Sequence, residues 1–374
     1  MNSFIAIQIG ARRSYAVPSI LAEAGMLEAF YTDLCADVGL GALISRLCPD
    51  VLKRGSVKKL LERRLPSNLH NKVNTFSTPV FRYLLRKQLA GNNLERATRT
   101  FTQFQFELGD AMIRQGVGQA THLYTMLGES TPFLRFAKES GLTTVTDIII
   151  LLNTHYIIKA EREKFPGIEP EPNEELVEET FEWVREVCSL TDWAIAPSEA
   201  VRQDLALNFG FPTQRCFVVP TAANCSWFNL ENQPVKGRVL FVGTAQLRKG
   251  IHILGMAAQK LSHRSYEFRV AGGVSEIVRQ HSLTEKLTFL GRVPRCEIKQ
   301  EYAQADIFVL PSLAEGSAGA TYEALAAGVP VITTEAAGSV VRDGIDGFIV
   351  PEGDAEALAD RIEELVENRE LRDR

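Results

Sequence analysis

The sequence lacks the patterns that would indicate a membrane span or a disulfide scaffold. No apolar run in its 374 residues approaches the ~20 residues that cross a bilayer. Residues 1–13 do not have the layout of a signal peptide, because the strand-like segment F-I-A-I-Q-I replaces the long apolar core. The six cysteines are scattered, with no C-x-x-C pair and no zinc spacing, which predicts reduced thiols in a cytoplasmic protein.

Two ligand-binding motifs are also missing. The predicted first strand, Phe4 to Ile9, ends at Gly10 without G-x-G-x-x-G, so the dinucleotide-binding fingerprint is absent. No D-x-D metal-binding triplet occurs anywhere in the chain. Internal repeats and low-complexity tracts are absent as well.

The composition suits a chain with two domains. The chain is longer than one ordinary domain, and 45% hydrophobic residues are enough for two cores. Strand-like and helix-like segments alternate on both sides of residues 221–236, where periodicity is poor. We therefore predict an α/β protein with an N-terminal domain at 1–220, a hinge at 221–236 and a C-terminal domain at 237–374. The predicted strands include Leu27 to Thr32, Thr121 to Thr125, Thr143 to Leu152, Asp192 to Ala196, Arg238 to Val242, Glu267 to Ala271, Leu287 to Leu290, Ile307 to Leu310 and Val329 to Thr333.

The most informative stretch runs from residue 306 to residue 334. Its apolar run at 307–310 predicts a buried strand, and residues 320–327 predict a short helix. Two carboxylates belong to it, Glu315 in the loop and Glu323 on the helix. Loops at the carboxyl ends of parallel strands form the ligand crevice of an open sheet, so both carboxylates are candidate ligand contacts. A carboxylate in a first helical turn also suits the helix dipole, so Glu323 alone does not require a ligand.

Two cations stand where another helix begins. The strand predicted at 238–242 is followed by the turn G-T-A-Q-L-R-K-G and by a helix from Ile251. Arg248 and Lys249 therefore lie at the positive end of the helix dipole, and this repulsion destabilises the helix by about 0.3–1 kcal/mol for each cation. A bound diphosphate would remove this conflict, because the helix N–H groups and both cations would face it. The pattern predicts a phosphate site.

These motifs together resemble a known enzyme family. The spacing E-x7-E of Glu315 and Glu323, followed by A-L-A-A-G-V-P-V-I, is similar to the signature of retaining nucleotide-sugar glycosyltransferases of family 4, glycosyl transferases group 1. R-K-G after the first strand of the second domain resembles the donor-phosphate site of that family. The resemblance implies the GT-B fold, in which two Rossmann-like domains face each other across a cleft. It is specific in the second domain and diffuse in the first.

The resemblance also implies roles for individual residues. Glu315 would contact the transferred sugar and Glu323 the ribose hydroxyls, while Arg248 and Lys249 would stabilise the leaving diphosphate. The first loop of the chain and a histidine after an interior strand would face the acceptor, although Gly10 also fits a plain strand-to-helix turn and a lone histidine is more often structural. The candidate catalytic residues are Arg248, Lys249 and Glu315; the candidate donor-binding residues are Thr244, Val293, Gly316, Ser317, Ala318, Gly319 and Glu323; the candidate acceptor-side residues are Gly10, Arg12, Arg13 and His155.

The chain departs from the family pattern at two points of the site. Thr244 stands where the family often has an arginine, so Arg248 is the expected substitute. Ser317-Ala318-Gly319 stand where an aromatic residue and a glycine are common, which leaves the identity of the donor open. Family members usually continue with helices that return to the first domain, and this chain is expected to lack them after Arg374.

Residues 44–100 form a strongly basic segment. The segment contains thirteen lysines and arginines and only three acidic residues, Asp50, Glu62 and Glu95. Its net charge is therefore +10, within a chain of formal charge −5. Apolar residues lie between the charges, as in amphipathic helices. The segment is either a solvated face or a surface for anionic lipid or a pyrophosphate-linked acceptor. In contrast, Glu161 to Glu186 is acidic, and its E-E-L-V-E-E-T-F-E-W-V pattern predicts mostly a solvated helix or a partner for the basic segment.

The expected function is transfer of a sugar from a nucleotide-diphosphate sugar to a saccharide or lipid-linked acceptor, with retention of anomeric configuration. Such an enzyme would work in envelope polysaccharide or glycolipid synthesis, in the cytoplasm or at the inner face of the membrane. Arg248 and Lys249 would take the place of a divalent metal, so neither a metal nor a cofactor is expected. A nucleic-acid partner is not expected either. Two alternatives remain: a nucleotide-sugar 2-epimerase of the same fold, and a non-catalytic nucleotide-sugar-binding subunit.

Overall fold

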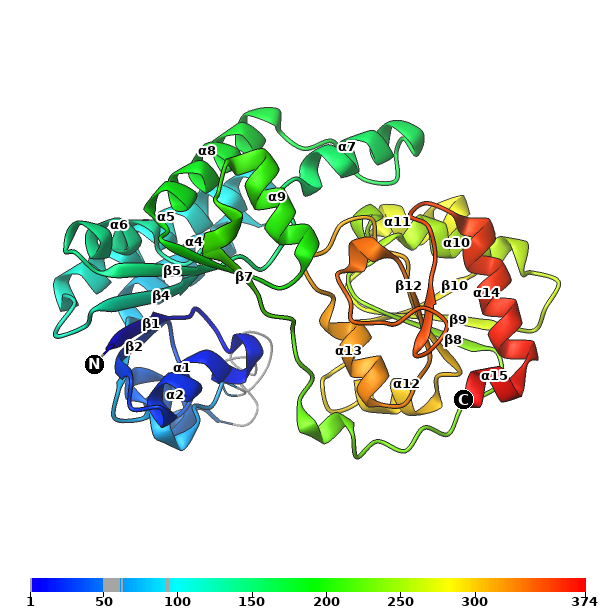
Figure 1. Cartoon of the computed structure of the whole chain (residues 1–374), viewed down its shortest axis with the longest axis horizontal. Helices are drawn as coiled ribbons and strands as arrows, with labels where there is room; N and C mark the ends of the chain where they lie inside the picture. The colour runs from blue at the N-terminus through cyan, green and yellow to red at the C-terminus, as the bar shows by residue number, and fades with distance from the viewer. Residues whose placement is uncertain (1, 50–60, 62, 92–93) are drawn as a thin grey trace. The chain divides into compact units, whose positions relative to one another are not determined.

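The computed structural model describes residues 2–49, 61, 63–91 and 94–374, and the chain forms two compact units (Figure 1). The first unit contains Met1–Ile148 and Asn173–Ile195, and the second contains Ile149–Pro172 and Ala196–Arg374. This division differs from the predicted boundaries at residues 220 and 237, because 149–172 and 196–220 are grouped with the second unit. Residues 149–172 belong to the second unit because two of their side chains, Ile158 and Ile168, are buried in its core.

The first unit is built on the strands β1 to β6 of a seven-stranded sheet, whose last strand, β7, belongs to residues 196–220. The strand order of this sheet is β3-β2-β1-β4-β5-β6-β7, and the pairs from β3 to β6 are parallel. Helices cover the faces of such sheets, which fits the apolar sequence F-I-A-I of β1. The strands are β1 Phe4–Ile7, β2 Leu27–Thr32, β3 Val73–Thr75, β4 His122–Met126, β5 Thr143–Asp147, β6 Trp193–Ala196 and β7 Cys216–Val218. The helices are α1 Ala16–Glu23, α2 Gly39–Leu47, α4 Ser77–Ala90, α5 Leu94–Gln115, α6 Thr131–Glu139 and α8 Glu174–Leu190.

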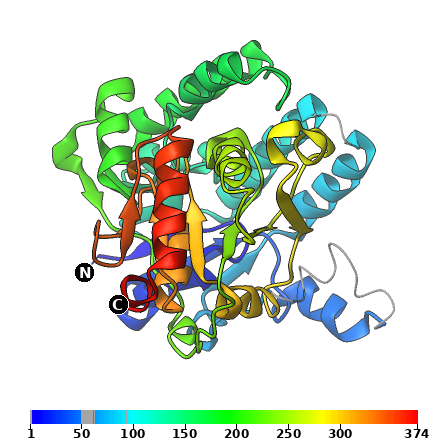
Figure 2. The same cartoon turned by 90° about the vertical axis from the view of Figure 1, so that its right-hand side faces the viewer.

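The second unit is built on another parallel sheet, with the strand order β10-β9-β8-β11-β12-β13. Figure 2 shows α14 (red) in front of this sheet, where it packs beside α10 and against β11 and β12. The strands are β8 Arg238–Val242, β9 Glu267–Ala271, β10 Leu287–Gly291, β11 Ile307–Leu310, β12 Val331–Thr333 and β13 Gly347–Ile349. The helices are α7 Thr154–Lys164, α9 Glu199–Phe209, α10 Ile251–Lys260, α11 Glu276–Gln280, α12 Ile298–Gln304, α13 Gly319–Ala326, α14 Ala355–Glu367 and α15 Arg369–Asp373.

The two sheets confirm the predicted α/β class, and most predicted strands are present. The prediction for Thr143–Leu152 was too long, because β5 ends at Asp147. The chain leaves the sheet there, and the Leu152 N–H donates to the Asp204 carboxylate at 2.5 Å instead of to a neighbouring strand. An apolar run alone did not reveal this exit.

The acidic stretch from Glu161 to Glu186, predicted to be mostly helical, is helical on both sides of a break. Two helices, α7 and α8, lie on either side of an irregular stretch at 165–173 that contains three prolines. Proline removes a backbone N–H and obstructs the preceding helical turn, so the acidic pattern could not continue as one helix. Asn173 caps the second helix, with its side chain accepting from the Glu175 N–H at 2.9 Å.

The segment predicted as a hinge, 221–236, packs against the second unit. Trp227 is buried, and its ring lies 5.0 Å from that of Tyr302. Asn232 donates to the carbonyl oxygens of Ala303 at 3.1 Å and Ala305 at 3.0 Å. These contacts give the segment fixed partners within the second unit.

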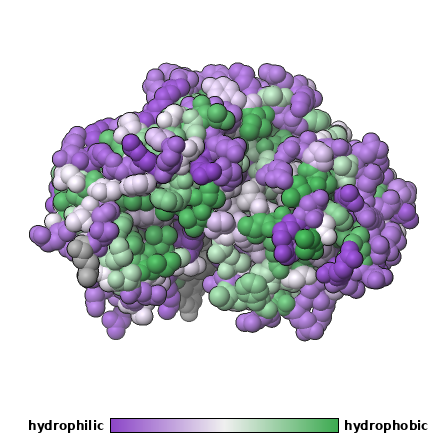
Figure 3. Space-filling model, viewed as in Figure 1, coloured by the Kyte–Doolittle hydropathy of each residue, from purple (hydrophilic) through white to green (hydrophobic). Residues whose placement is uncertain are grey.

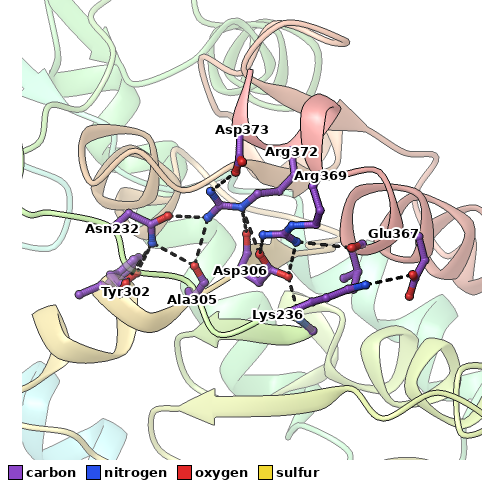
Figure 4. A network of polar contacts seen from close by, with 12 residues as sticks. Asn232, Lys236, Tyr302, Ala305, Asp306, Glu367, Arg369, Arg372 and Asp373 are labelled. Carbon is purple, nitrogen blue, oxygen red and sulfur yellow. Dashed lines mark hydrogen bonds and ion pairs between the residues drawn. The ribbon is translucent and has the colours of Figure 1, made fainter.

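The buried carboxylate of Asp306 holds the last helix, α15, against the second unit (Figure 4). Asp306 is 0% exposed and directly precedes β11. Its Oδ1 lies 2.7 Å from Arg369 Nη2 and 3.1 Å from Arg372 Nε, and its Oδ2 accepts from the Gly237 N–H at 2.7 Å. Helix α15 is therefore bound to the start of the central strand by charge-assisted contacts.

The basic segment at 44–100 is only partly described, because Lys53, Arg54, Lys58 and Lys59 lie outside the described residues. In the described part, α4 exposes Leu84, Leu85 and Leu89, and hydrophobic residues reach the surface at several places in Figure 3. Within the described ranges, no helix is both long enough and apolar enough to span a bilayer.

Candidate functional site

The turn after β8 is fixed where the sheet order changes direction. Strand β8 lies between β9 and β11, and the turn contains the 3₁₀ segment η6 (Leu247–Lys249) before α10. Gly250 follows η6 with φ +69°, and a Cβ there would lie 1.9 Å from the Pro311 carbonyl oxygen. Only glycine permits this approach, so the β8 turn and the loop after β11 are held together.

Arg248, Lys249 and Glu315 meet between these two loops. Arg248 Nη1 lies 2.8 Å from Glu315 Oε2 and 3.0 Å from the Ala314 carbonyl oxygen. Lys249 Nζ forms an ion pair with the other oxygen, Glu315 Oε1. The Glu315 side chain is 11% exposed and that of Lys249 14%. The carboxylate therefore balances both cations, so their position at a helix start does not by itself require a bound diphosphate.

A pocket of about 530 Å³ lies beside this cluster, at the carboxyl ends of β8, β9 and β10. Thr244, one of the predicted donor-binding residues, lines it, and Gly291 and Arg292 line it next to the predicted residue Val293. The pocket is lined by Glu169, Pro170, Thr244, Ala245, Gln246, Gly272, Gly273, Val274, Ser275, Arg279, Gly291 and Arg292. Its volume is in the range of small-molecule sites.

Glu323 lies in α13 and is oriented by a tyrosine from α12. Its Oε2 accepts from the Tyr302 hydroxyl at 3.3 Å. Burial raises the pKa of the Glu323 carboxyl above its ordinary value, and the charge of Arg295 and the hydrogen bond from Tyr302 oppose that shift. A partly buried carboxylate of this kind accepts hydrogen bonds from hydroxyl groups, the contact predicted with a ribose.

The loop before α13 holds the other predicted donor-binding residues. A Cβ at Gly316 would lie 2.3 Å from the Ile149 carbonyl oxygen, so this position tolerates only glycine. Ser317 Oγ donates to the Tyr322 hydroxyl at 2.9 Å. The Ala318 N–H donates to the Ala337 carbonyl at 3.0 Å, which removes it from the set of N–H groups predicted to surround a sugar. Gly319 begins the helix.

In the first unit, the predicted acceptor-side residues contact carboxylates at strand ends. The Gly10 N–H donates to Asp33 Oδ1 at 2.9 Å, and Arg63 Nη1 lies 2.5 Å from Asp33 Oδ2. Arg13 Nη1 lies 2.6 Å from Asp147 Oδ2. Because Asp33 follows β2 and Asp147 ends β5, both carboxylates occupy the edge of the sheet where ligands bind in folds of this type.

Glu129 follows β4 at the same edge and is 3% exposed. Its closest counter-ion is Arg12, whose Nε lies 3.8 Å from Oε1. Burial raises the pKa of the Glu129 carboxyl from 4.5 to about 8, and the negative charges of Asp33 and Asp147 add to the effect while Arg12 opposes it. Glu129 therefore exchanges its proton near neutral pH.

This pKa predicts a pH-dependent stability. The folded state keeps the Glu129 proton to a higher pH than the unfolded state, so the stabilisation present at acid pH is lost as the pH rises through about 8. We expect the free energy of unfolding to fall by about 2–3 kcal/mol between about pH 6 and about pH 9. Glu129→Gln should abolish most of this decrease in urea-unfolding curves, whereas Glu139→Gln, at an exposed site in α6, should keep it. An unchanged decrease in Glu129→Gln would contradict the assignment.

His155 is not grouped with the other acceptor-side candidates. It lies in α7, in the second unit, with its ring 5.3 Å from that of Tyr156. Gly10, Arg12 and Arg13 lie in the first unit. In the described part of the chain, no group of three or more histidine, cysteine or acidic side chains is placed to hold a metal ion.

Sequence reasoning missed several residues of these clusters. Asp33, Glu129 and Asp147 each follow or end a strand, and this signal could have found them because it had already identified Glu315. Gln246, with its amide oxygen turned toward Arg248, accepts from Nε at 3.1 Å, and no local pattern indicated this contact.

Part of the chain is similar in sequence to known glycosyltransferases. Residues 236–368 match the family model described as glycosyl transferases group 1. Over 177 residues the chain is 29% identical to the putative colanic acid biosynthesis glycosyltransferase WcaL of Salmonella typhimurium, covering 42% of this chain and 44% of WcaL. Over 186 residues it is 28% identical to the amylovoran biosynthesis glycosyltransferase AmsK of Erwinia amylovora, covering 44% and 45%. The matched region thus spans less than half the length of these curated relatives.

Solved structures share the fold over the whole chain. Sucrose-phosphate synthase of Thermosynechococcus elongatus superposes with a TM-score of 0.65 at 17% identity, covering 100% of this chain and 92% of that chain. Anabaena HepE in complex with UDP and glucose superposes with a TM-score of 0.60 at 15% identity, with the same coverage. Together with the two parallel sheets, these similarities confirm the predicted GT-B fold.

Proposed function

We propose that this protein is a glycosyltransferase that moves a sugar from a nucleotide-diphosphate sugar to a saccharide or lipid-linked acceptor. The observation that carries the proposal is the cluster of Arg248, Lys249 and Glu315 beside the pocket at the ends of β8 to β10. Two cations and a carboxylate at a helix start match the charges of a diphosphate and the hydroxyls of a sugar. The match of residues 236–368 to group 1 glycosyl transferases supports the same activity.

Each residue has a distinct role in the proposed reaction. Arg248 and Lys249 balance the charge that develops on the leaving diphosphate, and they are preorganised because Glu315 already orients them. Once phosphate oxygens take over the cations, the Glu315 carboxylate accepts hydrogen bonds from the sugar. Glu323 accepts from the ribose, with Tyr302 fixing its orientation. The anomeric configuration is retained, and these cations supply the charge compensation in place of a divalent metal.

Polysaccharide biosynthesis is the proposed biological setting. WcaL and AmsK are named for the biosynthesis of colanic acid and amylovoran, and CapM of Staphylococcus aureus, 31% identical over 143 residues, for that of capsular polysaccharide. That alignment covers 36% of this chain and 37% of CapM. HepE was crystallised with UDP and glucose, so UDP-hexoses are the donors to test first.

Donor turnover tests this proposal directly. Incubation of UDP-, GDP- and ADP-sugars with and without saccharide acceptors should release nucleoside diphosphate, and acceptor should increase the release. Activity should persist in EDTA, because the side chains supply the charge compensation. A 2-epimerase would convert the donor sugar without acceptor, and a binding subunit would bind the diphosphate without any turnover. Activity lost in EDTA and restored by magnesium would contradict the role given to Arg248 and Lys249.

We also propose that the segment at 44–100 brings the enzyme to the cytoplasmic face of an anionic membrane. Exposed leucines on α4 support this setting, although Arg63 and Arg86 are paired with Asp33 and Glu107. Each free basic residue near such a surface contributes about 1 kcal/mol. The protein should sediment with anionic vesicles and not with neutral ones, and less so in high salt. If the protein does not sediment with anionic vesicles at low salt, the segment is a solvated face; equal sedimentation with both kinds of vesicle would contradict the role of its positive charge.

A further inference from the structure

The carboxylate of Glu169, which lies 78 positions before Leu247 in the sequence, contacts the turn after β8 where a phosphate site was predicted. Glu169 Oε1 accepts from the Leu247 N–H at 2.6 Å. Leu247 is the first residue of η6, so this N–H stands directly before Arg248 and Lys249. Glu169 also lines the pocket, together with Thr244 and Gln246 from the same turn.

The segment that carries Glu169 is anchored to the second unit. Upstream in α7, Glu161 Oε1 lies 2.8 Å from Nε2 of His252, a fully buried residue of α10. The Phe165 ring lies 4.6 Å from the His252 ring, and Ile168 is buried in the core. Glu169 directly follows the buried residue Ile168, so the packing of Ile168 in the core places the Glu169 carboxylate beside the turn.

The carboxylates of the chain occupy the groups that a diphosphate would need. Glu169 takes the Leu247 N–H, and Glu315 takes Arg248 and Lys249. Carboxylate and phosphate oxygens are equivalent acceptors for backbone N–H groups at a helix start. A diphosphate at this turn must share one pocket with the Glu169 charge, whose nearest cation is Arg162, with Nη2 3.6 Å from Oε2.

We propose that Glu169 is a built-in competitor of the donor diphosphate, which displaces its carboxylate from the Leu247 N–H on binding. The inference rests on the proposed function, because it assumes that a nucleoside diphosphate binds this turn. After displacement Glu169 keeps Arg162 as its counter-ion, whose Nη2 already lies 3.6 Å from Oε2. The contact keeps the turn folded in the absence of donor and makes diphosphate affinity weaker than the cations alone would give.

Replacing Glu169 by glutamine removes the charge and keeps an oxygen that accepts from the Leu247 N–H. Glu171→Gln removes the same charge two residues further on, at an exposed position, and is the matched control. Binding of UDP, GDP and ADP and of the corresponding nucleosides to the full chain is measured by calorimetry, for the parent protein and both variants.

We expect Glu169→Gln to bind its preferred nucleoside diphosphate about tenfold more tightly, with nucleoside affinity unchanged, because one like charge leaves the pocket. Glu171→Gln should match the parent protein. An equal effect of both variants, or no tightening, overturns the inference while leaving the proposed function in place. Weaker binding of diphosphate and nucleoside alike also overturns it, because Glu169 would then be a ribose or base ligand. If neither the parent protein nor Glu169→Gln binds any diphosphate, the proposed function fails, and the inference fails with it.

Discussion

Lys249→Ala is expected to weaken nucleoside diphosphate binding by about 10- to 100-fold, while binding of the nucleoside alone stays unchanged. A charge-assisted contact between an ammonium group and a phosphate oxygen contributes roughly 1.5–3 kcal/mol. The Lys249 side chain is 14% exposed and lies over Gly243, where a Cβ would be 2.9 Å from Lys249 Cδ. Its position is therefore set by packing, and the variant removes a charge that solvent screens weakly.

The control for Lys249 lies at the other end of the same helix. Lys260, the last residue of α10, forms an ion pair with Glu356 at the surface. Lys260→Ala should leave the affinity for UDP, GDP and ADP unchanged in the same calorimetric titrations. Equal losses for nucleoside and diphosphate in Lys249→Ala would remove the phosphate role, and a matching loss in Lys260→Ala would point to a general effect of net charge.

Glu315→Gln is expected to lower turnover about a hundredfold or more while diphosphate affinity is kept or increased. Its carboxylate is the group that orients Arg248 and Lys249, and misplaced catalytic groups cost about this much in rate. Removing its negative charge leaves both cations available to phosphate, so binding of the diphosphate should not suffer. Steady-state rates and calorimetric affinities on the same preparations measure the two effects separately.

The second carboxylate of the E-x7-E spacing provides the contrast. Glu323→Gln should weaken nucleoside and diphosphate binding together, because the ribose contact is common to both. The Tyr302 hydroxyl can donate to the amide oxygen of glutamine as it does to the carboxylate, so the fold should be kept. If both variants melt at lower temperature but retain full activity per folded molecule, the two carboxylates serve the fold and not the reaction.

Local patterns determined much of the second unit. The apolar run at 307–310, the turn bearing Arg248 and Lys249, and the spacing of Glu315 and Glu323 each lie within a short stretch of sequence. In these stretches the strand ends and helix starts coincide with turn residues and changes of hydrophobic period, so the sequence pattern located them, although it did not locate the end of β5. The predicted strand β8, the helix α10 and the loop between them follow from this, as does the parallel α/β class.

Contacts between residues distant in sequence were decided only by the tertiary structure. Arg248 and Glu315 were both predicted site residues, but their ion pair depends on the order of β8 and β11 in the sheet. Glu169 reaches the Leu247 N–H from 78 positions away in the sequence, and Glu129 gains its raised pKa from burial that no run of neighbours specifies. Burial and electrostatic pairing depend on which elements pack together, and a chain of alternating strands and helices permits many packings with the same local patterns.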